Sequence, residues 1–262
     1  YLQTRTDDKG IVVREEPNGW CLGEWSTPHN RIEIPASLVN TAYFYHVTCI
    51  MADVAGILDK KEDEHHLHTL AETIRKNFNA AFYNDVTHHY WEGKQGADVF
   101  ALAFGLVLEG KQEKVFSALL EHLKKVNYHF DTGILATPLL LKVLTENGRA
   151  DLAYKLMNQR DFPSYGYLAD KKNNTLWETW NGDGNDEGCG HCHPMFGSVV
   201  AWFYNSLAGI KPDLVNPGMK HFYVEPIIVS GLEYCRASYD SLYGQIPVSY
   251  THLRAHETEL HL

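Results

Sequence analysis

Apolar residues recur at steps of three and four positions in several separate segments, and this helical periodicity restricts the fold more than any other sequence feature. The first segment follows Pro35 and ends near Ile57, and the second covers about Glu62–Phe82. Five further helices are predicted over about Gln95–Leu108, Glu113–Val126, Thr137–Glu146, Asp151–Gln159 and His193–Gly209. The sequence therefore predicts a mainly α-helical domain.

Residues that favour capping mark the helix ends, and the helices follow one another as antiparallel pairs. Thr137 and Pro138 are predicted to form the N-cap and first turn of one helix, which Asn147 and Gly148 end. No short sequence repeat accompanies the pairs, which argues against a TPR or ankyrin solenoid. Helical hairpins closed into a barrel, with long loops at one end forming a site, fit the pattern better.

The sequence changes character near its C-terminal end, where short apolar runs replace the helical periodicity. The runs 222–224 and 227–229 suggest β-strands, with prolines and glycines between them. We therefore expect residues 211–246 to begin a C-terminal β-domain. The segment Pro247–Leu262 shows no strand alternation and resembles translated sequencing-adapter read-through, so it is predicted to be a non-native tail. A native polar tail is the alternative.

Composition and charge disfavour several classes of partner. The 262 residues carry a formal net charge of −10 and no cluster of lysine or arginine, which disfavours nucleic acid and anionic polymers. No apolar run reaches the length of a membrane span. Five scattered cysteines do not suggest a disulfide framework. Because the chain opens at Tyr1 without an initiator methionine, we expect a fragment, whose oligomeric state stays open.

The segment Asn174–Phe196 holds the strongest candidates for chemistry. It reads NTLWETWNGDGNDEGCGHCHPMF and lacks helix or strand periodicity, which in an aromatic-rich chain indicates an ordered functional loop. Glu178 stands between Trp177 and Trp180, whose indole faces could stack on sugar rings. A carboxylate among indoles loses solvation, so its pKa is expected to rise toward values suited to proton transfer. The alternative is a surface glutamate on a short strand.

Two other positions are weaker candidates. Glu24 beside Trp25 repeats the combination of a carboxylate and an indole. The alternative for this pair is a turn held by a buried tryptophan ring. Gln95 stands at the start of a predicted helix, where its side chain could cap the helix or face a ligand.

Clusters of potential metal ligands are also present, but we expect neither a metal nor a cofactor. Cys189 and Cys192 with His193 lack the second ligand pair that a structural zinc site normally needs. The segment Asp183–Gly188 resembles the start of a calcium loop, but its twelfth position is Pro194 instead of glutamate. A looser calcium site stays open. Three histidines of the second predicted helix are expected on a solvated face.

Several motifs keep the order and spacing found in one family of glycosidases. They are Gly23-Glu24-Trp25, Gln95-Gly96-Ala97, Ala101-Leu-x-Phe-Gly105-Leu, Asp131-Thr-Gly133-Ile-Leu-Ala-Thr137, Thr175-Leu-Trp-Glu178-x-Trp180, His191-x-His193-Pro-Met-Phe-Gly-Ser-Val, Trp202-Phe-Tyr and Leu207-Ala-Gly-Ile. Together they resemble the bacterial α-L-rhamnosidases, which are inverting six-hairpin glycosidases. The resemblance spans about residues 15–230. It implies that residues 1–210 form the C-terminal part of an (α/α)6 barrel and that a β-sandwich domain follows.

The resemblance implies hydrolysis of terminal α-L-rhamnosides, with Glu178 as the general base that activates water. It also implies a set of substrate-binding residues around the rhamnose pocket, namely Trp177, Trp180, His193, Glu24, Trp25 and Gln95. Glu24 stands where the family usually has aspartate. An inverting hydrolase needs a second carboxyl group as general acid. The family's Asp-Cys-Pro-x-Arg-x-Glu segment, which carries it, is absent and expected upstream, so we expect this chain to be inactive alone.

Two other functions stay open beside this hypothesis. One is another six-hairpin glycosidase or a sugar phosphorylase, although no basic residues surround Glu178 to bind phosphate. The other is a non-catalytic carbohydrate-binding module that uses the tryptophans. The resemblance suggests a bacterial periplasmic or secreted protein, with a cytoplasmic location as the alternative.

Overall fold

The computed structural model describes residues 1–13, 23–28, 34–171, 175–181, 190–194 and 196–251. Its helical elements are η1 (Leu2–Arg5), α1 (Ala36–Ile57), α2 (Lys61–Phe82), α3 (Gln95–Phe104), α4 (Gln112–Lys125), α5 (Ala136–Glu146), α6 (Ala150–Met157), α7 (Tyr165–Asp170), η2 (Phe196–Val199), α8 (Val200–Trp202) and η3 (Phe203–Leu207). Its strands are β1 (Ile210–Pro212), β2 (Phe222–Val224), β3 (Tyr234–Ser241) and β4 (Gly244–Thr251). The prediction of a mainly helical fold followed by strands is confirmed. No helix of the described residues is both long and apolar enough to cross a bilayer.

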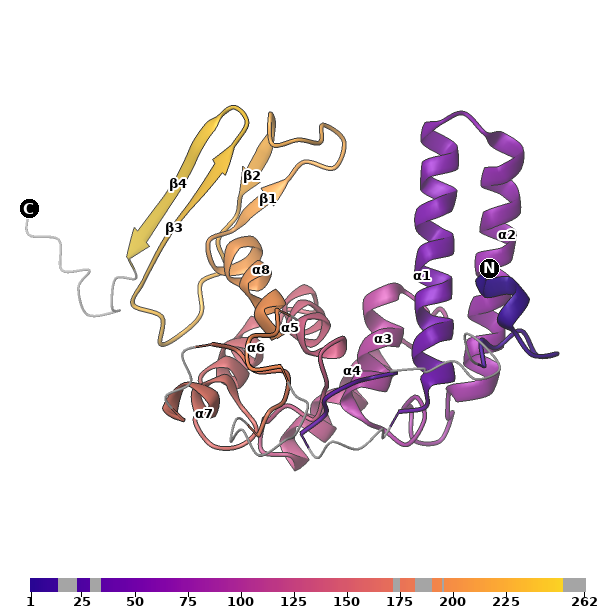
Figure 1. Ribbon diagram of the computed structural model, residues 1–262, viewed down its shortest axis with the longest axis horizontal. Coiled ribbons are helices and arrows are strands. Elements are labelled where there is room, and N and C mark those ends of the chain that lie inside the picture. The colour runs from indigo at the N-terminus through magenta and orange to yellow at the C-terminus, as the bar shows by residue number, and fades with distance from the viewer. Residues whose placement is uncertain (14–22, 29–33, 172–174, 182–189, 195, 252–262) are drawn as a thin grey trace, which may run out of the picture.

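Helices α1 and α2 form a long antiparallel pair that projects beyond the shorter helices (Figure 1). Pro35 precedes α1 with an extended backbone, as its position in the sequence predicts. The base of α1 is buried through residues such as Leu38 and Val39. Its projecting half exposes the apolar side chains of Val47, Ile50, Met51, Val54 and Ile57. The apolar stripe of this helix is therefore buried only at the base of α1, at Val39, and is exposed from Val47 onward.

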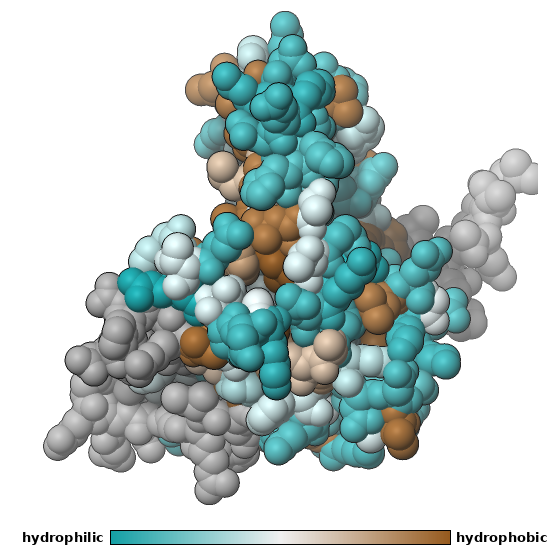
Figure 2. Space-filling model, turned by 90° about the vertical axis from the view of Figure 1, so that its right-hand side faces the viewer, coloured by the Kyte–Doolittle hydropathy of each residue, from teal (hydrophilic) through white to brown (hydrophobic). Residues whose placement is uncertain are grey.

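The second helix turns its polar residues to solvent. Its histidines are exposed as predicted, at positions His65, His66 and His68. The residues Ile74, Phe78 and Phe82 are buried on the opposite side, toward the core. Figure 2 views the molecule from the side of this helical pair and shows a mostly hydrophilic surface with hydrophobic residues among it. Helix α2 is thus amphipathic, as its periodicity indicates.

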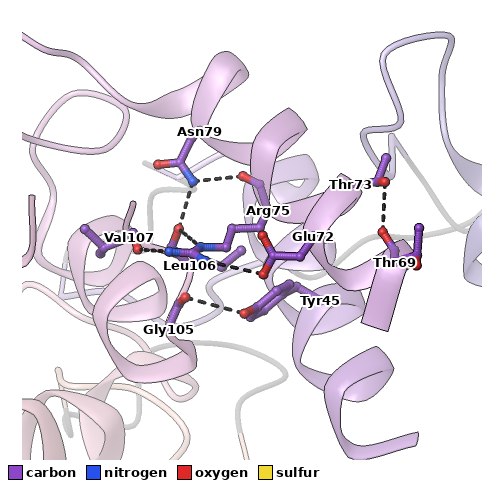
Figure 3. Close-up of polar contacts among 9 residues, drawn as sticks. All are labelled: Tyr45, Thr69, Glu72, Thr73, Arg75, Asn79, Gly105, Leu106 and Val107. Atoms are coloured by element: carbon purple, nitrogen blue, oxygen red, sulfur yellow. Dashed lines mark hydrogen bonds and ion pairs between the residues drawn. The ribbon is translucent and has the colours of Figure 1, made fainter. Parts of the chain in front are cut away.

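Two side chains of α2 hold the C-terminal end of α3 (Figure 3). Arg75 donates to the carbonyl oxygens of Leu106 at 3.4 Å and Val107 at 2.8 Å. Asn79 donates to the Leu106 oxygen at 2.8 Å. Carbonyl groups beyond a helix end have no partner within the helix, so these side chains satisfy them. Gly105, with a φ of +75°, ends α3 earlier than predicted.

The turn before α5 differs from the prediction. Helix α5 begins at Ala136, so Thr137 lies in its first turn and is not the N-cap. The Thr137 hydroxyl donates to the carbonyl oxygen of Gly133 at 2.6 Å and lies 2.7 Å from the Thr132 hydroxyl. The N-cap prediction is wrong because this hydroxyl bonds back to a carbonyl four residues earlier. The result is a compact turn between residues 132 and 137.

The end of α5 agrees with the sequence, whereas the following connection contains an extra helix. Asn147 directly follows α5, and Gly148 has a φ of +73°, so the predicted end is confirmed. Helix α7 lies where no helix was predicted, and the Ser164 hydroxyl caps it by accepting from the Tyr167 amide at 3.0 Å. A helix of six residues is too short for its periodicity to be read.

An aromatic group in the core lies beside the candidate loop. Trp180 stacks on Phe130 with 5.2 Å between ring centroids. Tyr165 and Phe196 flank the same indole, with centroids 5.3 and 4.4 Å away. Trp180, Phe130 and Phe196 are almost fully buried, and burial of each such ring stabilises the fold by roughly 1.5–3 kcal/mol. These rings anchor the segment that carries Glu178.

The strands form two separate antiparallel pairs, β1 with β2 and β3 with β4. Residues 227–229 were predicted as a strand but belong to no strand pair. The reason is that the Ile227 amide donates to the Ser206 carbonyl at 2.9 Å, which ties this segment to the preceding helical turn.

Residues 247–251 belong to β4, so the prediction of no strand in this segment is wrong for them. Pro247 and Val248 lie opposite Ser238 and Ala237 of β3. The hydroxyl of Tyr250 donates to the Leu207 carbonyl at 2.9 Å, which connects β4 to the helical part. The rest of the predicted non-native tail, residues 252–262, lies outside the described residues.

Candidate active site

Backbone hydrogen bonds join the segments 175–181 and 190–194 in an antiparallel arrangement. The Glu178 amide donates to the Gly190 carbonyl at 2.9 Å, and the His193 amide donates to the Leu176 carbonyl at 2.9 Å. The Thr175 hydroxyl donates to the His191 carbonyl. This pairing places Trp177 and Glu178 beside His191 and His193, which the sequence separates by a loop.

Each carboxylate oxygen of Glu178 accepts a hydrogen bond. The Gly190 amide donates to Oε2 at 2.7 Å, and the Trp25 indole N–H donates to Oε1 at 3.0 Å. A β-carbon at Gly190 would lie 3.3 Å from Oε2 and 3.6 Å from the His193 ring, so a glycine allows this close approach. The carboxylate is therefore fixed by residues that are distant in the sequence.

These contacts hold the pKa of Glu178 below its ordinary value. The Gly190 amide contributes most, partial burial opposes it, and the Trp25 indole and the nearby His193 ring lower the pKa further. The expectation of a raised pKa is wrong, because the carboxylate is only half-buried and accepts two hydrogen bonds. At neutral pH Glu178 is ionised and can accept a proton.

Trp177 and His191 form a stacked pair next to Glu178. Their ring centroids lie 3.9 Å apart with an interplanar angle of 9°. Trp177 is half-buried and His191 is exposed. The sequence assigned no role to His191, although it stands in the same motif as His193. The stack covers one face of the Trp177 indole and fixes the orientation of the ring.

Trp180 lies in the core and has no surface to offer a sugar. Its side chain is 1% exposed, and its indole N–H donates to the Thr132 carbonyl at 2.9 Å. The prediction of sugar contact is therefore corrected to a supporting role. Residues two positions apart would lie on the same side of a strand, but the backbone bends over residues 178–181, so Glu178 is half-buried while Trp180 packs inward.

Glu24 is buried as well, with 1% of its surface exposed. Its Oε1 atom accepts hydrogen bonds from the amides of Gly133 at 2.6 Å and Ala136 at 3.0 Å. Burial outweighs these contacts and raises the pKa of Glu24 to about 8. The prediction of substrate contact is corrected, because this carboxyl group is neutral at pH 7 and enclosed by protein.

Gln95 is fully buried and joined to backbone groups of the following connection. Its side-chain amide donates to the His129 carbonyl at 2.8 Å and its oxygen accepts from the Asp131 amide at 3.1 Å. The Gln95 backbone amide donates to the Asp131 carboxylate at 3.2 Å. The prediction of ligand contact is corrected here too, because the side chain braces the start of α3.

The candidate metal ligands do not form a cluster among the described residues. Cys192 is a free, exposed thiol. Cys189 and the segment 183–188 lie outside the described residues. A hollow of about 590 Å³ lies elsewhere, against η3 and β3, and is lined by residues that include Phe203, Tyr204 and Tyr234. Its lining also includes Glu233.

Comparison with known proteins identifies the domains of this chain. A sequence model described as the bacterial alpha-L-rhamnosidase 6 hairpin glycosidase domain matches residues 1–207. The model of the bacterial alpha-L-rhamnosidase C-terminal domain matches residues 209–261. Both domains occur in the order that the fold shows.

Relatives with these domains are much longer than this chain. An alpha-L-rhamnosidase of Formosa agariphila is 31% identical over 240 residues, which cover 87% of this chain and 26% of the relative. The structure of alpha-L-rhamnosidase from Dictyoglumus thermophilum is 32% identical, with a TM-score of 0.85 over 93% of this chain and 27% of that chain. This chain thus spans about a quarter of their length.

A Streptomyces avermitilis alpha-L-rhamnosidase, whose crystal structure is a complex with L-rhamnose, is 30% identical with a TM-score of 0.84. The similarity covers 97% of this chain and 24% of that chain. Sequence motifs, fold and domain order agree with one another. This chain belongs to the bacterial alpha-L-rhamnosidase family of six-hairpin glycosidases.

Proposed function

We propose that this chain supplies the general base of an enzyme that hydrolyses terminal α-L-rhamnosides with inversion. The observation that carries the proposal is the Glu178 carboxylate, which is ionised at neutral pH and fixed by the Gly190 and Trp25 donors. A general base must be ionised and oriented to take a proton from the attacking water. Family membership gives the substrate class, since the relatives are named for it and one is in complex with L-rhamnose.

In this mechanism Glu178 takes a proton from water as the oxygen attacks the anomeric carbon. A second carboxyl group, about 6.5–9.5 Å from the base, protonates the leaving oxygen from the other side of the bond. Glu24 is protonated at neutral pH but is enclosed by protein, so it cannot reach a leaving group. We assign the general acid to a segment beyond these 262 residues, and this chain alone is then inactive on natural rhamnosides.

Two residues beside the base are proposed to contact the sugar. The Trp177 ring, held by its stack on His191, offers an apolar surface suited to the C–H groups of rhamnose. His193 is half-buried next to Glu178 and can bond a hydroxyl group through its ring nitrogens. Trp25 contributes through its bond to Glu178. The substrates are terminal rhamnosides of oligosaccharides, polysaccharides or glycoconjugates.

The test uses an extended protein, in which this chain is joined to the rest of a six-hairpin domain. Glu178→Gln in that protein should lower kcat by about 10²–10⁴-fold with unchanged thermal unfolding. Glu146→Gln, a change of the same kind on the exposed end of α5, should leave kcat unchanged. NMR of the first product should show the inverted anomer of rhamnose. Normal turnover of the Glu178 variant, or a retained anomer, would remove this assignment.

A further inference from the structure

The turn between Gly133 and Ala136 binds both residues of the Glu24–Trp25 pair. The Trp25 carbonyl accepts from the Ile134 amide at 2.9 Å. The Glu24 carboxyl accepts from the amides of Gly133 at 2.6 Å and Ala136 at 3.0 Å. Three hydrogen bonds from one turn fix the backbone that carries the Trp25 indole.

The contact between this turn and Trp25 leaves no room for a side chain. A β-carbon at Gly133 would lie 1.9 Å from the Trp25 carbonyl oxygen and 3.1 Å from the Glu24 carboxylate. The carbonyl of Thr132, the preceding residue, accepts the Trp180 indole N–H at 2.9 Å. The segment 132–134 therefore contacts two tryptophans, namely Trp25, which donates to Glu178, and Trp180, which lies two residues after Glu178.

We infer that Trp25 is a positioning residue, whose indole N–H holds Glu178 Oε1 in place, and that Glu24 and the Gly133 turn serve to fix Trp25. The inference rests on the proposed function, because it gives Glu178 the role of the base. It assigns Trp25 no direct contact with the reacting atoms. Trp25 provides one neutral hydrogen-bond donor, which reaches Glu178 from a segment far away in the sequence.

The Trp25 donor has two separable effects on a base. It fixes the direction of the carboxylate, which leaves the remaining lone pairs pointing toward one location for water. It also stabilises the ionised form, although less than the Gly190 amide does. Removing the indole N–H should therefore raise the pKa of Glu178 and lower kcat, whereas a residue that only fills space would leave the pKa unchanged.

The contribution of Glu24 does not depend on a negative charge. Its Oε1 atom accepts both amides, and burial keeps the carboxyl group protonated at neutral pH. A glutamine has the same shape and a carbonyl oxygen that can accept the same two bonds. An alanine would leave the amides of Gly133 and Ala136 without this acceptor, so the turn and Trp25 would move together.

The first experiment measures the dependence of kcat/KM on pH for Trp25→Phe in the extended protein. The acid limb, which reports ionisation of the free base, should move to higher pH by up to about one unit, and kcat should fall by roughly tenfold. Trp202→Phe is the matched control, since it removes an indole donor to Thr145 at 2.7 Å. Its acid limb should not move.

A direct titration separates this inference from the proposed function. Glutamate labelled with ¹³C at the carboxyl carbon, assigned with Glu178→Gln, gives the Glu178 pKa by NMR even in a protein without activity. An unchanged pKa and an unchanged acid limb in Trp25→Phe would overturn the inference, whatever the role of Glu178. If Trp25→Phe does not fold, β-(3-benzothienyl)-alanine at position 25 removes the N–H and keeps the ring shape.

The second experiment compares two changes of Glu24 in the extended protein. Glu24→Gln should keep kcat within about threefold and leave the acid limb in place, whereas Glu24→Ala should shift that limb in the same direction as Trp25→Phe. Equal losses in both variants would show that the charge or proton of Glu24 matters and would overturn its supporting role. Normal kinetics in Glu24→Ala would also overturn the supporting role of Glu24.

Discussion

A methyl group at position 133 should disturb the candidate site more than its size suggests. The β-carbon of Gly133→Ala would lie 1.9 Å from the Trp25 carbonyl oxygen, and real contacts of this kind are essentially never below 3.0 Å. The two segments must separate by about 1.1 Å, the difference between these distances. That displacement breaks or weakens the bonds from the Ile134 amide to Trp25 and from the Gly133 amide to Glu24.

The magnitude follows from those two bonds. A buried polar group left without a partner costs about 1–3 kcal/mol, so we expect Gly133→Ala to lower the free energy of unfolding by roughly 2–6 kcal/mol. Because Trp25 moves with its backbone, Glu178, the proposed base, moves as well. A misplacement of about 1 Å can lower the rate by roughly 10²-fold. Both effects have the same origin.

Urea unfolding of the chain and the kcat of the extended protein are the assays. Gly197→Ala is the matched control, because its β-carbon would meet only the Leu176 side chain at an ordinary 3.7 Å. We expect this control to change the free energy of unfolding by less than about 0.5 kcal/mol. A Gly133→Ala protein as stable and as active as the control would refute the close contact with Trp25 and the reasoning built on it.

The remaining predictions concern stability and activity. Asn79→Ala should cost about 1–3 kcal/mol in urea unfolding, because the Tyr90 hydroxyl loses its acceptor and the Leu106 carbonyl keeps only the longer bond from Arg75. Burial raises the pKa of the Glu24 carboxyl group from 4.5 to about 8, so between these pH values the folded chain holds a proton that the unfolded chain releases. The free energy of unfolding should therefore fall as pH rises from 4.5 to about 8, and Glu24→Gln should make this fall smaller in unfolding curves. Removing residues 247–262 should cost more than about 1 kcal/mol, since it deletes most of β4. The chain alone should release no product from natural rhamnosides in an assay where the extended protein does, and equal activity of the two would place the general acid within these residues.

The helices could be predicted because apolar residues recur at helical spacing along the sequence. The predicted segments for α1 and α2 agree with the structure to about one residue, since proline and apolar periodicity mark their limits. Helix α7 was missed because six residues carry no readable period. The prediction of a strand at 227–229 was wrong because the Ile227 amide donates to the Ser206 carbonyl at the end of a helix. Local composition does not reveal such a contact between segments distant in the sequence.

The sequence singles out Glu178 as a candidate but does not show how its side chain is held. The motif around Glu178 indicates the base, but its indole donor comes from Trp25, and the sequence pattern does not show that these two side chains meet. Burial distinguishes Gln95 and Trp180 from Glu178, because these two side chains form hydrogen bonds with backbone groups of residues 129–132 in the core. A sequence motif does not distinguish a residue that contacts a ligand from one that supports the contact.

The two pairs of a glutamate and a tryptophan show why acidity could not be predicted from neighbours in the sequence. Glu178 and Glu24 each adjoin an indole, yet one has a lowered pKa and the other a pKa of about 8. Both accept two N–H groups, so hydrogen bonding alone does not separate them. The difference is solvent: Glu178 is half-buried, and Glu24 is enclosed. Trp25 connects the two, because its backbone adjoins the neutral carboxyl and its side chain bonds the ionised one. A buried neutral acid can thus support the half-buried carboxylate of the proposed base without adding a negative charge that would raise its pKa.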